Sequence, residues 1–129
     1  MQTEVLTNNP DIQSLIPEGF LFTRIDGSSR DVLTAVRDRI HLGAKLLAHP
    51  MAGRLRPNET PFATAVLRSA DPDDPQPLDL ASLEIIEYCL AEIRKYEDLP
   101  KKYDGILLPD LRFIDCQLFQ SILQELNVR

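Results

Sequence analysis

The sequence predicts a small single-domain α/β protein, with a mainly parallel sheet of about four strands and helices on both faces. Three observations predict this class. The chain has 129 residues, 43% of them hydrophobic, which is enough to close one core without cross-links. Short apolar runs alternate with helical patterns in the first half, as they do in βαβ units. The second half carries two one-sided apolar stripes, which must pack against another element.

The first 30 residues contain two predicted strands separated by a short helix. Residues 5–7 form an apolar run that stops before Asn9 and Pro10. Asparagine is a good helix N-cap and proline is favoured at the first helical position, so a short helix is expected over about 11–15. A second strand is expected over 20–25.

The next segment has the clearest helical pattern. Its apolar residues recur at helical spacing, and they are Val32, Leu33, Val36 and Ile40. His41 ends this helix, where positive charge is favoured, and suits a capping or surface role. Gly43 stands where a helix C-cap is expected, and a third strand over 45–48 ends at His49-Pro50.

An irregular loop over 51–61 leads to a fourth strand over 62–68. Because this loop is poor in helical signal, we expect the fourth strand to be antiparallel to the third. Residues 69–77 form an acidic linker with three prolines and three aspartates, which we expect to be exposed. The prediction is therefore one domain over 1–129, with this linker on its surface.

Two amphipathic helices complete the predicted fold. The first stripe comprises Leu80, Leu83, Ile86, Leu90 and Ile93, and the second comprises Leu111, Ile114, Leu118, Ile122 and Leu126. Between them, residues 106–108 favour a short extra strand. Cys89 and Cys116 are interpreted as buried free thiols that act as small apolar groups. The final helix is also apolar at Phe113, Phe119 and Leu123, which suggests an interface in a homo-oligomer.

Composition excludes several classes of protein. The chain has 14 basic and 20 acidic residues, a formal charge of −6, which argues against a nucleic-acid binder. No apolar run approaches the ~18 residues of a membrane span, and the amino terminus lacks a secretory pattern. We therefore expect a cytoplasmic protein that neither binds nucleic acid nor enters a membrane. Two cysteines fit no disulfide or zinc pattern, and no metal or cofactor is predicted.

The charge is unevenly distributed along the chain. Residues 30–56 hold six basic side chains against two acidic ones, which gives this segment a net charge of +4. Since the whole chain carries −6, the other residues together carry −10. A basic zone on an acidic protein indicates a defined anionic ligand or partner.

Polar residues gather where the predicted strands end. The carboxyl ends of parallel strands share one edge of a sheet, where ligands tend to bind, and an antiparallel fourth strand brings loop 51–61 to that edge. Helix starts after Asn9 and Ser29 would add backbone N–H groups that attract anions. The sequence therefore predicts a small-anion pocket formed by Asn8, Asn9, His49, Arg54, Arg56, Asn58, Glu59 and Thr60.

Each candidate also has a structural interpretation. Asn8 and Asn9 can end a strand and cap a helix, Arg54 and Arg56 can be solvated, and 58–61 can form a rigid turn. The alternative function is a small hydrolase or transferase, in which His49 is the general base and Glu59 orients it. No nucleophile is evident beside them.

Two segments resemble a known family. They are Thr7-Asn8-Asn9-Pro10 and a longer block containing Asp31-Val32-Leu33, Val36-Arg37-Asp38, Ile40-His41, Gly43, Lys45-Leu46-Leu47, His49-Pro50, Gly53 and Pro57-Asn58-Glu59-Thr60-Pro61. Together they resemble the GrdX family, small proteins encoded with the glycine, sarcosine and betaine reductase systems of amino-acid-fermenting anaerobes. The resemblance covers about residues 5–67.

The resemblance implies an accessory protein of unknown role in amino-acid reductive metabolism, without an established activity. The family context adds a protein of the reductase system as a second candidate partner, beside the small anionic metabolite that the polar edge predicts. The family's motif positions fall at Asn8, Asn9, His41, His49, Pro50, Gly53, Asn58, Glu59, Thr60 and Pro61.

Overall fold

The structure, a computed structural model, describes residues 2–51 and 53–127. Its strands and helices follow the order expected from the sequence, with a 3-10 helix, η1, after the first strand. The elements are β1 (Thr3–Thr7), η1 (Pro10–Leu15), β2 (Leu21–Arg24), α1 (Ser29–His41), β3 (Lys45–Leu46), β4 (Thr64–Arg68), α2 (Leu80–Glu97) and α3 (Leu108–Glu125).

The sheet is mixed, so the expectation of a mainly parallel sheet is wrong. Its four strands lie in the order β2-β1-β4-β3, with β1 and β2 parallel and β4 antiparallel to both β1 and β3. A parallel neighbour of β3 would need a crossover, usually a helix, and the described part of loop 47–63 contains none. The chain therefore reverses into β4, which confirms the expected antiparallel β3–β4 pair.

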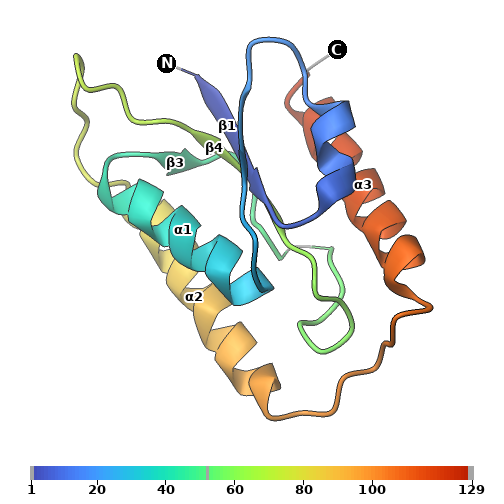
Figure 1. Cartoon of the computed structure of the whole chain (residues 1–129). Coiled ribbons are helices and arrows are strands. Elements are labelled where there is room, and N and C mark those ends of the chain that lie inside the picture. The colour runs from blue at the N-terminus through green and yellow to red at the C-terminus, as the bar shows by residue number, and fades with distance from the viewer. Residues whose placement is uncertain (1, 52, 128–129) are drawn as a thin grey trace.

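Helices cover both faces of the sheet, as Figure 1 shows. α1 and α2 pack against the face that carries Leu6 of β1 and Leu67 of β4. α3 and η1 cover the opposite face, around Val5, Val66 and Phe119. Alternate residues of β1 and β4 thus enter two separate apolar layers, because successive side chains of a strand point to opposite faces.

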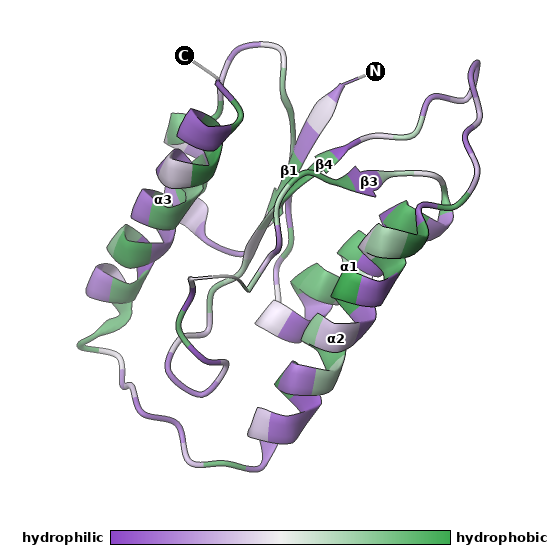
Figure 2. Cartoon of the chain, turned by 180° about the vertical axis from the view of Figure 1, so that it is seen from behind, coloured by the Kyte–Doolittle hydropathy of each residue, from purple (hydrophilic) through white to green (hydrophobic). Residues whose placement is uncertain are grey.

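Helix α3 packs on a stripe that overlaps the expected one only in part: Leu111 is buried, and Ile122 and Leu126 pack against the core. The structure buries Leu111, Asp115, Cys116, Phe119 and Leu123, whereas Ile114 is 40% exposed. Apolar residues occur on two sides of this helix. The side that packs against β1 and β4 also carries Asp115, which is therefore buried. Figure 2 shows hydrophobic and hydrophilic segments alternating along α3. Phe119 and Leu123, which suggested an interface between copies, are thus buried within the chain.

Other expectations have mixed outcomes. Residues 106–108 form a turn and the first residue of α3, so the extra strand is wrong: Asp104 accepts from the Ile106 and Leu107 amides, which closes a turn. Residues 69–77 form neither helix nor strand and are mostly exposed. Both cysteines are free and buried, as expected. No helix among residues 2–51 and 53–127 is both long and apolar enough to cross a bilayer.

Candidate functional site

The carboxyl ends of three strands lie on one edge of the sheet. β1, β2 and β3 run in the same direction, and β4 begins at the edge where they end, because Thr7 pairs with Thr64. Loop 47–63 connects β3 to β4 at this edge and lies between the α1–α2 layer and α3 (Figure 1). The topology therefore brings Asn9, Arg54 and Thr60 to the same end of the fold.

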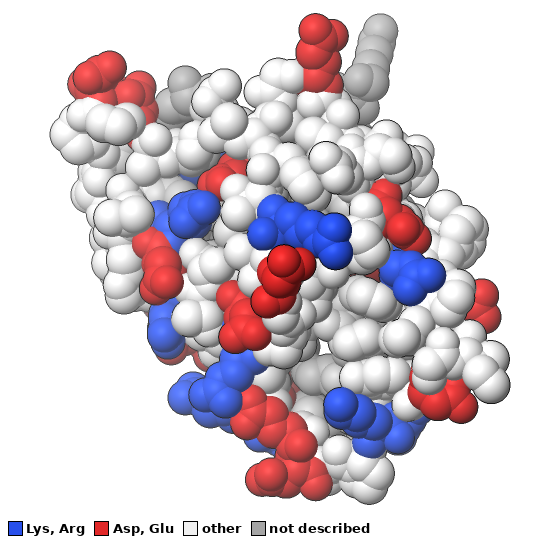
Figure 3. Space-filling model, viewed as in Figure 1, with Lys and Arg blue, Asp and Glu red and all other residues white. Residues whose placement is uncertain are grey.

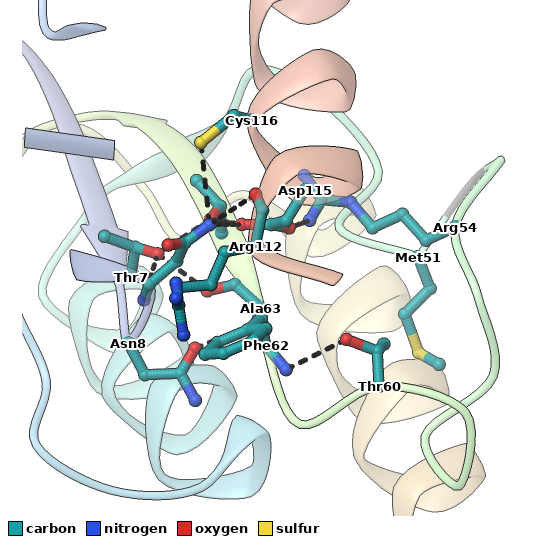
Figure 4. Close-up of polar contacts among 12 residues, drawn as sticks. Thr7, Asn8, Met51, Arg54, Thr60, Phe62, Ala63, Arg112, Asp115 and Cys116 are labelled. Carbon is teal, nitrogen blue, oxygen red and sulfur yellow. Dashed lines mark hydrogen bonds and ion pairs between the residues drawn. The ribbon is translucent and has the colours of Figure 1, made fainter. Parts of the chain in front are cut away.

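A buried polar network centres on Asp115 of α3 (Figure 4). The Thr64 hydroxyl donates to Asp115 Oδ2 at 2.6 Å, and Asn9 Nδ2 donates to the same oxygen at 3.0 Å. Thr7 and Thr64, paired across β1 and β4, have hydroxyl oxygens 2.7 Å apart. The network joins the sheet to α3, and buried hydrogen bonds of this kind fix one arrangement of the layers.

Arg54 completes the network from the loop. Its Nη1 lies 2.6 Å from Asp115 Oδ1, and the two side chains are only 7% and 6% exposed. Burial lowers the pKa of the Arg54 guanidinium, and the charge of Asp115 opposes that effect. Arginine nevertheless stays protonated in proteins, so this is a buried ion pair.

One nitrogen of Arg54 has no partner. Nη2 is buried and makes no hydrogen bond among the described residues. A buried donor without an acceptor is costly, by roughly 1–3 kcal/mol and more for a charged group. Such a group in a native fold requires an explanation, and contact with a water molecule, an ion or a ligand is one.

Arg54 and Asp115 line a small cavity at the same edge. Its volume is about 40 Å³, room for roughly three water molecules at ~10–15 Å³ each. Most of its walls are apolar, and Thr60 and Ser29 are polar residues in the lining besides Arg54 and Asp115. Ile114 lines the cavity and is 40% exposed, so its side chain lies between the cavity and solvent.

Asn8 and Asn58 hold loops in place. Asn8 Nδ2 donates to the carbonyls of Gly27 and Pro61, and Asn8 Oδ1 accepts from the Ala63 amide at 2.9 Å. Asn58 Nδ2 donates to Pro100 O at 3.2 Å. The side chain of Asn8 is therefore fully used by the protein, while the buried Asn58 Oδ1 has no partner among the described residues.

His49 and Glu59 have separate partners. His49 Nδ1 accepts from the Met51 amide at 3.1 Å, and its ring stacks edge-on against Tyr88, 6.0 Å between centroids. Glu59 Oε1 accepts from the Arg56 amide at 2.9 Å. Within residues 2–51 and 53–127, no hydrogen bond joins His49 to Glu59. His49 and Arg56 line a neighbouring groove against α2, and neither lines the cavity.

The two helix starts are satisfied by their own side chains. Asn9 Oδ1 accepts from the Asp11 amide at the start of η1. At α1, Ser28 and Asp31 form a reciprocal capping box. An anion at either start would compete with these caps, so Arg54 is the stronger candidate for an anion contact.

The basic segment does not form a basic surface. Four of its six basic residues pair with acids from elsewhere in the chain: Arg30 with Glu97, Arg37 with Glu87, Arg39 with Glu4, and Arg54 with Asp115. Figure 3 shows acidic and basic side chains interspersed on this face. The net charge of +4 of residues 30–56 is therefore largely balanced by acidic side chains that lie elsewhere in the sequence.

Sequence reasoning missed Asp115, Thr64 and Thr7. One signal was available for Asp115, which stands between Leu111 and Phe119 at spacings of four on the final helix. A carboxylate at such a position faces the apolar layer and requires a buried partner. Nothing in the sequence indicated which of the 14 basic residues would supply it.

Both thiols near this edge are protonated at neutral pH. Burial raises the pKa of Cys89 to about 11. Burial and the charge of Asp115 raise the pKa of Cys116. In the described part of the chain, no three His, Cys, Asp or Glu side chains are placed to share a metal ion.

One comparison with known proteins gives a match. The model of one protein family, described as GrdX-like protein, matches residues 4–124. This range contains most of β1 and α3 and every element between them. No curated protein and no solved structure matches the chain.

Proposed function

The chain belongs to the GrdX-like family, and we propose that this member binds a small anionic metabolite in the cavity lined by Arg54 and Asp115. The observation that carries the proposal is the buried Nη2 of Arg54, which has no hydrogen-bond partner among the described residues and belongs to a side chain lining that cavity. A guanidinium arm directed at an anion forms a charge-assisted hydrogen bond, the stronger kind.

The place of the cavity supports the same proposal. It lies at the carboxyl edge of the sheet, where ligands of open α/β sheets tend to bind. Three helices contribute to it: Leu33 from α1, Ile93 from α2 and Leu118 from α3. A ligand here would touch both helical layers and the loop between β3 and β4, and so would stabilise the whole fold.

Membership of the family supports a proposal for the role in metabolism. We propose an accessory protein of the glycine, sarcosine and betaine reductase systems, which holds a metabolite without converting it. The alternative, an enzyme using His49 and Glu59, lacks support because the two side chains have separate partners. A protein partner and a second copy of the chain stay predictions, since no contact in the described residues favours either.

A thermal-shift titration tests the proposal. Acetate, propionate, sulfate and inorganic phosphate are each titrated into the wild type, Arg54→Lys and Arg24→Lys. Arg54→Lys keeps a cation beside Asp115 but lacks the second arm, and Arg24, an exposed residue on β2, is the matched control. We expect saturable stabilisation, about 2.7 kcal/mol at a hundred times Kd, in the wild type and Arg24→Lys and its loss in Arg54→Lys. Equal stabilisation of all three proteins, or of none, contradicts the proposal.

A further inference from the structure

We infer that the Arg54 cavity selects a short aliphatic monocarboxylate over phosphate and sulfate. This inference rests on the proposed function and names the class of ligand. It follows from the charge of the site, the donors it offers and the chemistry of its walls.

The net charge around the cavity favours a monoanion. Arg54 is neutralised by Asp115, whose carboxylate oxygen lies 2.6 Å from Nη1. The cavity therefore offers a charged donor without a net positive charge. A dianion beside Asp115 meets repulsion about twice that of a monoanion at the same distance. Arg112, the basic residue nearest along α3, pairs with Asp11 at 3.2 Å and does not line the cavity.

The number of free donors also matches a carboxylate. Besides Arg54, whose buried Nη2 has no partner among the described residues, the lining residues include Thr60 and Ser29, each of which carries a hydroxyl. The Thr60 oxygen accepts from the Phe62 amide at 3.2 Å, which leaves the Thr60 proton available to a ligand. Two or three donors serve the two oxygens of a carboxylate, whereas the four oxygens of phosphate or sulfate would stay partly unpaired in a buried site.

The remaining walls are suited to hydrocarbon. Leu55, Phe62, Ile114 and Leu118 lie among the lining residues. Burial of one CH₂ group contributes about 0.8 kcal/mol, so each methylene that stays inside tightens binding by roughly fourfold. The volume of about 40 Å³ has room for roughly three water-sized groups, so only the first carbons of the ligand lie inside and a longer chain would extend past Ile114 into solvent.

Isothermal titration calorimetry of the full chain tests the inference. Acetate, propionate, butyrate, inorganic phosphate, sulfate and neutral propionamide are titrated at constant ionic strength. We expect propionate to bind about fourfold more tightly than acetate, phosphate and sulfate to bind at least tenfold more weakly than propionate, and propionamide not to bind.

Two tryptophan variants locate the binding. Ile114→Trp fills the mouth of the cavity, and Ile106→Trp places the same side chain on a residue that is 84% exposed and does not line it. We expect Ile114→Trp to abolish propionate binding and Ile106→Trp to preserve it. Propionate binding that survives Ile114→Trp unchanged overturns the inference.

The outcomes separate the inference from the proposed function. Phosphate or sulfate binding as tightly as propionate, and lost in Ile114→Trp and Arg54→Lys, overturns the monocarboxylate class and leaves an anion site at Arg54. Binding of none of these anions overturns both. Equal affinity for acetate, propionate and butyrate overturns the role of the apolar walls.

Discussion

Arg54 and Asp115 stand 61 residues apart in the sequence, yet their side chains meet at 2.6 Å in the interior. The pair joins loop 47–63 to α3, and Thr64 and Asn9 link it to the sheet. A single ion pair thus fixes the relative positions of a loop, a helix and two strands. It also positions the donor on which the proposed anion site depends.

Removing one member of this pair should be strongly destabilising. Asp115→Ala leaves the Arg54 charge buried without a partner, so we expect the free energy of unfolding to fall by about 3–5 kcal/mol. The double variant Arg54→Met with Asp115→Leu removes both charges and should recover most of that loss. Urea denaturation of Arg54→Met, Asp115→Leu and the double variant that combines them measures the coupling. Additive losses in the double variant would show that the pair does not interact as described.

Asn8 is expected to act as a structural connector. Asn8→Ala removes two donated hydrogen bonds and the acceptor for the Ala63 amide. We expect a loss of about 2 kcal/mol in the free energy of unfolding, because partly buried groups are left unpaired. Asn8→Asp keeps the acceptor but sets a charged carboxylate oxygen against the Gly27 and Pro61 carbonyls, so its loss should be at least as large. A loss below about 0.5 kcal/mol for Asn8→Ala, which is the range of ordinary surface substitutions, would contradict this role.

The threonine pair should show coupled effects. Thr64→Val removes the donor to Asp115 Oδ2 and the contact with the Thr7 hydroxyl while keeping the shape of the side chain. We expect each of Thr64→Val and Thr7→Val to cost about 1–2 kcal/mol. The double variant should cost less than the two losses added together, since both substitutions break the same network. If the losses in the free energy of unfolding, measured by chemical denaturation, are strictly additive, the two hydroxyls do not interact and the prediction is wrong.

Cys89 should resist alkylation at neutral pH. Burial raises its pKa to about 11, so the thiolate that reacts is scarce in the folded protein. We expect iodoacetamide to label Cys89 slowly at pH 7 and rapidly after unfolding, as read by mass spectrometry. Because the folded pKa lies above the ordinary value of 9.0, the stabilisation is complete below about pH 9 and is lost as pH rises toward 11. Cys89→Ala should lack this loss between pH 9 and 11, and an identical pH profile for that variant would refute the assignment.

His49 should be dispensable for anion binding. It lines the groove beside Tyr88 and is absent from the cavity lining. We expect His49→Gln to change propionate affinity less than twofold, roughly within the ±0.5 kcal/mol of a neutral substitution. Calorimetry measures the affinity directly. A tenfold or greater loss of propionate affinity in His49→Gln would show that His49 contributes to binding, and would support the alternative in which His49 is a general base.

The order of the elements could be read from the sequence because it depends on local patterns. The spacing of Val32, Val36 and Ile40 predicted α1, and all three are buried in the structure. The absence of helical signal before Phe62 predicted the antiparallel β3–β4 pair. The prediction of a mainly parallel sheet was wrong because β4 lies between β1 and β3 and is antiparallel to both. Strand order depends on tertiary packing, which local sequence patterns do not specify.

The sequence predicted which edge of the sheet gathers polar residues, but not most of the contacts among them. The edge where β1 ends and β4 begins follows from strand direction, so Asn9, Arg54 and Thr60 could be associated from the sequence. Asp115 could not be paired with Arg54, since 61 residues separate them and no local rule connects a loop with a later helix. The sequence also could not distinguish the two arginines of the loop. Arg54 is buried in the structure, whereas Arg56 is exposed.

The central claim is that the second arm of Arg54 holds a small anion, and nuclear magnetic resonance of the arginine side chains tests it most directly. The Nε–Hε signal of Arg54 is assigned by its absence from the spectrum of Arg54→Lys. Propionate is then titrated into the labelled wild-type protein. We expect the Arg54 signal to shift saturably and by the largest amount among the arginines. An Arg54 signal that stays in place while propionate reaches molar concentration would contradict the account.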